Sequence, residues 1–202
     1  ALSINHTNVV ETYEVGLTMK GQPVLIMEYI AGPSMQNIVV QKQEEHVSGR
    51  RLKLIRDMAE SLKYVHSMQY IHRDICPRNF ICLPGGIGVK LIDFGLTVPA
   101  TAPFMVPGNR TGTPLYMSPE VLDGRGYEWK SDVWSLGCLL YELASLRSPF
   151  KAEGDNLFML FKKISVGKVG LHHTHTLRDT TQTRHALPTR VPPNSSSLPS
   201  AP

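Results

Sequence analysis

Asp74, Asn79 and Asp93 are the side chains of this sequence whose types and spacing best suit chemistry. Asp74 and Asn79 lie in the run HRDICPRN at residues 72–79, and Asp93 opens a DFG triplet. Mg²⁺ prefers oxygen ligands and keeps several waters, so one Asp and one Asn with phosphate oxygens form a sufficient set. Transfer of a phosphoryl group from ATP needs such a metal and a carboxylate that orients the attacking hydroxyl. These residue types and their spacing therefore suit a metal shared by Asn79 and Asp93 beside a carboxylate, Asp74, that could orient a hydroxyl group.

A predicted β-hairpin positions these groups. Phe80–Leu83 and Val89–Ile92 have the composition of strands and flank a Pro-Gly-Gly turn. The hairpin would bring Asn79 and Asp93 to neighbouring strand ends. Asn79 follows Asp74 by five residues, which is enough for a loop to direct both side chains into one cleft.

Apolar residues at three- and four-residue steps predict helices around this hairpin. The clearest is Arg51 to Tyr70, whose predicted buried face consists of Leu52, Ile55, Met58, Ala59, Leu62 and Val65. Two more helices are predicted, from Asp132 to Ser145 and from Asn156 to Ile164. The other predicted elements are two strands, Val9–Gly16 and Val24–Tyr29, and an exposed, adjustable loop rich in Pro, Thr and Gly, Thr97–Thr113.

Composition excludes several classes of function. The 202 residues carry a net charge of +4, without a Lys/Arg stripe that has interleaved aromatic residues, so no nucleic-acid partner is expected. Cys76, Cys82 and Cys138 are too few and too scattered for a disulfide framework or a zinc site, which predicts reduced thiols of an intracellular protein.

No membrane association is expected either. The longest apolar stretch, Val133 to Leu146, is interrupted by Glu142 and is too short to span a bilayer, so it predicts a buried helix instead. No signal-peptide pattern opens the sequence. These features predict a cytoplasmic protein, with the nucleus as an alternative location.

The chemical residues lie in motifs that resemble a known family. Residues 72–79 resemble the catalytic loop of eukaryotic protein kinases, residues 93–95 their magnesium-binding triplet, and GTPLYMSPE at 112–120 the end of their activation segment. The resemblance covers about residues 4–165 and implies an α+β, protein-kinase-like fold. The implied parts are a partial small-lobe sheet with the hinge at 1–30, a mainly helical large lobe at 31–168, and a Pro/Ser/His-rich tail at 169–202, which its composition predicts to be disordered.

The resemblance assigns roles to matching residues. Asp74 would accept or orient the proton of the substrate hydroxyl, and Asn79 and Asp93 would hold magnesium. Arg73 would pair with a phosphorylated residue of the activation segment, and Thr113 would bridge to Asp74. The implied cofactors are ATP and Mg²⁺. The implied partners are a protein substrate with Ser or Thr and an upstream activating kinase.

A nucleotide-binding hinge is also implied. Residues 27–30 resemble the segment that contacts adenine, with Met27 at its start and backbone groups of Glu28 and Ile30 bonding the base. Ile81 would pack beneath the ring.

Further structural contacts follow from the same resemblance. His72 and Phe94 would stack, Glu120 would form an ion pair deeper in the lobe, and Asp132 would bond the backbone of the catalytic loop. A narrower resemblance, to the NIMA-related serine/threonine kinases, rests on residues 130–164 and on Ser118, where alanine is more usual.

The pattern departs from the family at Cys76. Serine/threonine kinases usually carry a lysine there, which contacts the transferring phosphate, and a thiol cannot replace that charge. Losing one such contact costs about 3 kcal/mol of barrier, which slows catalysis without abolishing it. Arg78 is more typical of tyrosine kinases and would restore some charge, whereas Thr113 and Pro114 favour serine/threonine specificity.

The usual position of activating phosphorylation holds Asn109, which cannot accept a phosphate in the way that Ser or Thr does. Thr111 and Thr101 are the alternatives, and a phosphate on either would order the loop by pairing with Arg73.

The motifs that precede and follow this region in kinases are not recognisable. A glycine-rich loop, the nucleotide lysine and an arginine partner for Glu120 are missing, which predicts a domain incomplete at both ends. The rival interpretation is a non-catalytic, kinase-like binding module. Asp74, Asn79 and Asp93 favour the enzyme, because a scaffold has no chemical need for all three.

Overall fold

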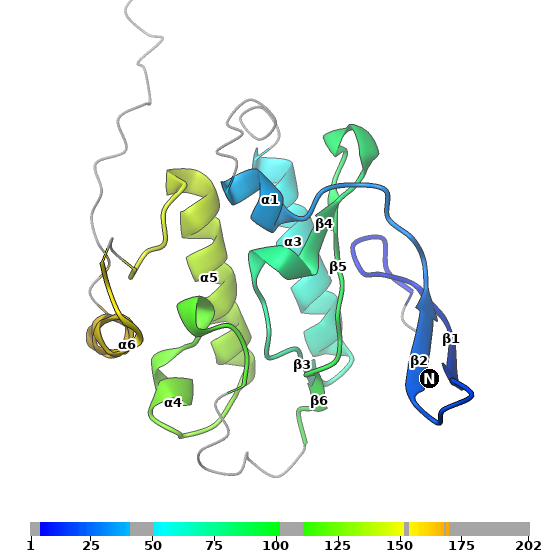
Figure 1. Cartoon of the computed structure of the whole chain (residues 1–202). Coiled ribbons are helices and arrows are strands. Elements are labelled where there is room, and N and C mark those ends of the chain that lie inside the picture. Colours follow the sequence, from blue (N-terminus) through cyan, green and yellow to red (C-terminus); the bar gives the residue numbers. More distant parts are fainter. Residues whose placement is uncertain (1–4, 41–50, 102–110, 152–153, 168, 170–202) are drawn as a thin grey trace, which may run out of the picture. The chain divides into compact units, whose positions relative to one another are not determined.

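The computed structural model describes residues 5–40, 51–101, 111–151, 154–167 and 169. All of them belong to one unit of the chain, Ala1–His172. The mixed α+β composition predicted from the sequence is confirmed (Figure 1). The elements in chain order are β1 Thr12–Leu17, β2 Pro23–Met27, α1 Met35–Val40, α3 Arg51–Ser67, β3 Tyr70–Ile71, β4 Phe80–Cys82, β5 Val89–Leu91, β6 Val98–Pro99, α4 Pro119–Leu122, α5 Trp129–Ser145 and α6 Leu157–Val166, with 3₁₀ turns at Pro77–Asn79, Pro84–Gly86 and Pro114–Tyr116.

The strands form three two-stranded antiparallel sheets, β1–β2, β3–β6 and β4–β5. The predicted strand from Val9 is wrong at its start, because Val9 and Val10 pair with β5 instead of joining β1. The Val10 N–H donates to the Leu91 carbonyl at 2.9 Å, and both valines are buried. The loop predicted from Thr97 also contains a strand, β6, while residues 102–110 of it lie outside the described residues.

The β1–β2 hairpin exposes apolar side chains on both of its faces. All five residues of β2 are exposed. Successive strand residues point to opposite faces, and strands that are apolar on both faces are typical of sheets covered on both sides. The exposed apolar residues are Tyr13, Val15, Leu17, Val24, Leu25, Ile26 and Met27.

The buried face of α3 differs from the predicted one. Met58, Leu62 and Val65 are buried as predicted, but Leu52 and Ala59 are exposed and Ile55 is half-buried. Two polar residues complete the buried stripe in their place. Asp57 accepts from Lys53 Nζ at 2.7 Å, and Ser61 Oγ donates to the Met58 carbonyl at 2.7 Å. Because these groups are satisfied, they can face the core, which an apolar pattern cannot reveal.

The helix ends were predicted less accurately than the helices themselves. α3 stops at Ser67, since Gln69 adopts φ +61° and Tyr70 enters β3. α5 begins at Trp129, three residues before the predicted start, because Ser131 Oγ accepts from the Glu128 N–H at 3.2 Å and caps an earlier turn. Asn156 precedes α6 as its cap, accepting from the Met159 N–H at 2.9 Å.

The predicted burial of α5 is largely observed. Leu136, Cys138, Leu139 and Leu143 lie in the core, whereas Val133 is exposed. Within the described part of the chain, no helix is long and apolar enough to cross a membrane.

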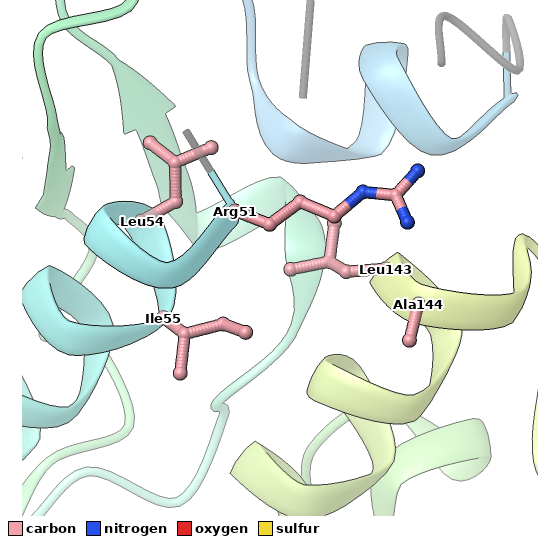
Figure 2. Close-up of a pocket in the computed structure, with 5 residues that line it drawn as sticks. All are labelled: Arg51, Leu54, Ile55, Leu143 and Ala144. Carbon is pink, nitrogen blue, oxygen red and sulfur yellow. The ribbon is translucent and has the colours of Figure 1, made fainter. Parts of the chain in front are cut away.

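A small apolar pocket lies between α3 and α5 (Figure 2). Its volume of about 20 Å³ is far too small for a nucleotide. Its lining residues are Arg51, Leu54, Ile55, Leu143 and Ala144. The pocket is therefore a packing defect away from the residues predicted to do chemistry.

At Gly32 the backbone of the segment after β2 packs closely against the backbone of β4. A Cβ built on Gly32 would lie 1.9 Å from the Cys82 carbonyl oxygen, and the neighbouring Cys82 N–H donates to the Pro33 carbonyl at 2.9 Å. Only a residue without a side chain allows this backbone approach.

Gly32→Ala should therefore lower the free energy of unfolding by about 2–3 kcal/mol, because backbone atoms must move apart. Urea denaturation measures this change. The matched control is Gly137→Ala, since an added Cβ on that exposed glycine of α5 meets nothing within 4 Å. It should stabilise the protein by about 0.5–1 kcal/mol through helix propensity. Equal effects of the two substitutions would contradict the explanation.

Candidate active site

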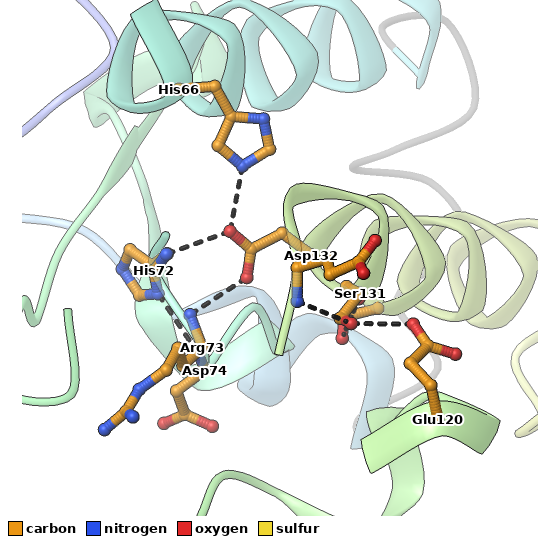
Figure 3. Close-up of polar contacts among 9 residues, drawn as sticks. His66, His72, Arg73, Asp74, Glu120, Ser131 and Asp132 are labelled. Atoms are coloured by element: carbon orange, nitrogen blue, oxygen red, sulfur yellow. Dashed lines mark hydrogen bonds and ion pairs between the residues drawn. The ribbon is translucent and has the colours of Figure 1, made fainter. Parts of the chain in front are cut away.

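Asp132 of α5 holds the backbone of the predicted catalytic loop (Figure 3). Its carboxylate is 1% exposed and accepts from the His72 N–H and the Arg73 N–H, both at 2.9 Å. His66 Nε2 of α3 lies 2.9 Å from the same carboxylate. Arg73 adopts φ +69°, which costs about 1–3 kcal/mol for a residue with a side chain. The contacts with Asp132 stabilise this conformation.

The next residue, Asp74, is buried and surrounded by donors. Thr113 Oγ1 donates to Oδ1 at 2.7 Å, while Arg78 Nη2 and Asn79 Nδ2 donate to Oδ2 at 2.8 and 3.0 Å. Burial raises the pKa of Asp74, but these donors outweigh it and hold the pKa below its ordinary value. Asp74 is therefore an ionised, oriented carboxylate at neutral pH.

Asn79 and Asp93 lie at neighbouring strand ends, as predicted. The Ile92 N–H donates to the Asn79 carbonyl at 2.8 Å, which brings the two residues together. Asn79 Nδ2 also donates to the Asp74 carbonyl at 2.8 Å, so the amide nitrogen is engaged and the amide oxygen remains for a metal. Asp93 is exposed and adopts φ +63°. One carboxylate and one amide oxygen fit Mg²⁺, which completes its shell with waters and phosphate oxygens.

Glu28 of the predicted hinge is tied to Glu11 and to β5. The Glu28 N–H donates to the Glu11 carbonyl at 3.0 Å, and the Glu28 carboxylate accepts from the Glu11 N–H at 2.8 Å and pairs with Lys90 of β5. Burial raises the pKa of Glu28, but the bonds to Lys90 and Glu11 lower it by more, so the pKa lies below its ordinary value. No pattern in the sequence indicates the ion pair of Glu28 with Lys90, because the two residues are 62 positions apart.

The other predicted adenine contacts remain predictions. Met27 is exposed at the end of β2, and the Ile30 carbonyl accepts from the Gly32 N–H at 2.9 Å. Ile81 lies in β4, half-buried and paired with Ser34.

Two predicted structural contacts need correction. His72 and Phe94 do meet, but their rings pack edge to face, with centroids 5.1 Å apart, instead of stacking. Burial lowers the pKa of His72, so the ring is neutral. Glu120 forms no ion pair among the described residues; instead it accepts from Ser131 Oγ at 2.6 Å (Figure 3). Among the described residues, Glu120 therefore has a neutral hydroxyl as its donor where an arginine was expected.

Arg73 contacts two parts of the structure that sequence reasoning did not identify. Its Nε donates to the Leu96 carbonyl at 2.6 Å, and its guanidinium carbon lies 5.7 Å from the centre of the Tyr127 ring. Its predicted pairing with a phosphorylated residue stays a prediction, and Asn109 lies outside the described residues.

Cys76 supplies no charge to this site. It is 1% exposed, and burial raises the pKa of its thiol. Cys82 and Cys138 are also buried, free thiols, as predicted. Arg78, which is exposed and paired with Asp74, is therefore the cation in contact with the predicted catalytic carboxylate.

The sequence profile of the protein kinase domain matches residues 1–190. The chain belongs to the protein kinase family. Three similar proteins are serine/threonine-protein kinase Nek5 of Mus musculus (34% identical, 87% of this chain and 28% of the relative), serine/threonine-protein kinase 36 of Pongo abelii (35%, 80% and 12%), and serine/threonine-protein kinase Nek1 of Mus musculus (32%, 87% and 15%). The chain thus spans less than a third of the length of each of these relatives. The predicted resemblance to NIMA-related kinases is confirmed.

Replacing Asp132, whose carboxylate holds the catalytic loop of this kinase chain, should lower the stability of the protein. Asp132→Ala leaves the buried N–H of His72 and the half-buried N–H of Arg73 without an acceptor, and we expect a loss of about 2–5 kcal/mol in the free energy of unfolding. The control is Asp123→Asn, because Asp123 is exposed and its one ion pair within the described ranges is with Arg125; its effect should stay within about 0.5 kcal/mol. Urea denaturation compares the two. A loss as small as that of the control would show that the loop does not depend on Asp132.

Proposed function

We propose that the chain is the large lobe and hinge of a serine/threonine protein kinase that transfers the γ-phosphoryl group of ATP to a protein hydroxyl. The observation that carries this proposal is the carboxylate of Asp74, which is ionised, buried and fixed by three donors, of which one is the hydroxyl of Thr113. The proposed parts are residues 1–30 for the small-lobe sheet and hinge, 31–168 for the large lobe, and 169–202 for a tail.

The residues of the chain divide the work as follows. Asp74 orients the attacking hydroxyl and accepts its proton as the hydroxyl oxygen bonds to the γ-phosphorus and the bond from that phosphorus to the ADP oxygen breaks, so that ADP leaves. Asn79 and Asp93 would hold magnesium, which would supply positive charge to neutralise the phosphate oxygens of ATP. Arg78 Nη2 lies 2.8 Å from Asp74, where its charge is close to the transferring group.

Thr113 supports a serine or threonine substrate. Its hydroxyl donates a hydrogen bond to Asp74, and Pro114 then begins the 3₁₀ turn Pro114–Tyr116 that leads to α4. The named relatives are serine/threonine kinases, which agrees with this assignment. An upstream kinase would act on the activation segment, and Arg73 would bind the resulting phosphate.

Cys76 is the observation that favours a non-catalytic binding module, because a neutral thiol replaces the usual lysine. The arrangement around Asp74 weighs more. Three donors on one buried carboxylate serve an acid–base role, and a scaffold would not require them.

Asp74→Asn tests the proposal directly. The polypeptide that the cell makes, containing this chain, should phosphorylate Ser or Thr in a protein substrate at about 1–100 turnovers per second. Asp74→Asn should lower kcat by about 10²–10⁴-fold, while Asp123→Asn should leave it unchanged. Phosphoamino-acid analysis identifies the product. Transfer to Tyr alone would overturn the substrate class, and a wild-type protein that neither binds magnesium–ATP nor transfers phosphate would support the binding module.

Cys76→Lys should raise kcat by about tenfold, which is less than the roughly 10²-fold value of one such contact, because Arg78 already supplies part of the positive charge near the transferring phosphate. Arg78→Ala should lower kcat of the wild-type protein by a similar factor but should matter less in the Cys76→Lys background, since the two cations serve one purpose. A double-mutant cycle on kcat measures this coupling. Purely additive effects would show that Arg78 does not substitute for the lysine.

A further inference from the structure

Tyr127 lies two residues before α5 and contacts both the activation segment and the catalytic loop. Its side chain is 5% exposed. Its hydroxyl donates to the backbone carbonyl of Thr111, and its ring faces the guanidinium of Arg73 at 5.7 Å. The kinase motifs at residues 72–79 and 112–120 did not include this tyrosine, so nothing in the proposed mechanism has used it.

Gly112 shows how closely the three parts fit together. It adopts φ +104°, and an added Cβ would lie 2.7 Å from the Arg73 carbonyl oxygen and 2.9 Å from the Tyr127 hydroxyl. The backbone at Gly112 is therefore enclosed between the catalytic loop and Tyr127. The next residue, Thr113, places its hydroxyl 2.7 Å from Asp74.

We propose that Tyr127 is a positioning residue of this kinase: its hydroxyl holds the Thr111 carbonyl so that Thr113 stays in contact with Asp74. The inference rests on the proposed function for its effect on catalysis, but the geometry itself is independent of activity. Tyr127 does not touch the reacting atoms. It acts through two residues of the activation segment.

The chemistry of the phenol suits this role. Burial raises the pKa of Tyr127 to about 12, so the hydroxyl remains a donor throughout the physiological range. A backbone carbonyl can accept but not donate, and the bond therefore has only one direction. The ring adds a contact between a cation and an aromatic face, which restrains Arg73 as well. One side chain thus restrains both segments that meet at Asp74.

Tyr127→Phe is the decisive variant, because it removes the hydroxyl and keeps the ring. We expect kcat on a Ser/Thr peptide to fall about tenfold, with the KM for ATP unchanged within about twofold, since a net hydrogen bond has that order of strength. Tyr127→Leu, which also removes the ring, should lose more. Tyr64→Phe is the matched control, because the Tyr64 hydroxyl bonds Asn5 far from the activation segment, and its kcat should equal that of the wild type.

Methyl NMR of threonine-labelled protein provides a readout besides activity. In Tyr127→Phe, the methyl groups of Thr111 and Thr113 should shift and their order parameters should fall, while Tyr64→Phe should leave them in place. Gly112→Ala should also shift the Thr113 methyl, because the added Cβ would lie too close to the Arg73 carbonyl oxygen and the Tyr127 hydroxyl.

The two measurements separate the two proposals. If the wild-type protein has no kinase activity but Tyr127→Phe still lowers the order parameter of the Thr113 methyl, the proposed function is wrong and the positioning role stands. An active protein in which Tyr127→Phe changes neither kcat nor the threonine methyls would overturn the inference about Tyr127.

Discussion

The buried carboxylate of Asp132 is the interaction on which the rest of the site depends. An ionisable group that is 1% exposed must be paired or hydrogen-bonded to be tolerated. Asp132 meets this requirement by accepting hydrogen bonds from two backbone N–H groups of the catalytic loop. Those bonds stabilise Arg73 in a left-handed conformation, and that conformation directs Asp74 toward its donors. α5 therefore positions the catalytic loop through backbone contacts, while side chains of the loop complete the surroundings of Asp74.

Electrostatics around Asp74 explain how the site tolerates an unusual residue. Cys76 is neutral and buried, so the loop lacks the cation that kinases of this type usually have there. Arg78 lies two residues further along and pairs with Asp74 from the solvent side. The carboxylate then carries its charge in a buried position because a cation and two neutral donors surround it. The site therefore has its positive charge at Arg78 instead of at position 76.

The sequence predicted the site better than the elements around it. Asp74, Asn79, Asp93 and Thr113 could be named because short motifs with fixed spacing encode local geometry, although their roles remain predictions. The buried face of α3 was misplaced, since satisfied polar residues such as Ser61 occupy it. Contacts such as Glu28 with Lys90 could not be predicted, because they join distant residues and no local pattern records them.

The apolar hairpin of β1 and β2 has a consequence for how much of this protein a cell would contain. Small differences in stability change the abundance of a protein several-fold, because they change the fraction of unfolded chains. Every residue of β2 is exposed, so the hairpin contributes little apolar burial to the stability of the described residues. A mutation in β2 should therefore alter abundance less than a mutation of equal size in the core.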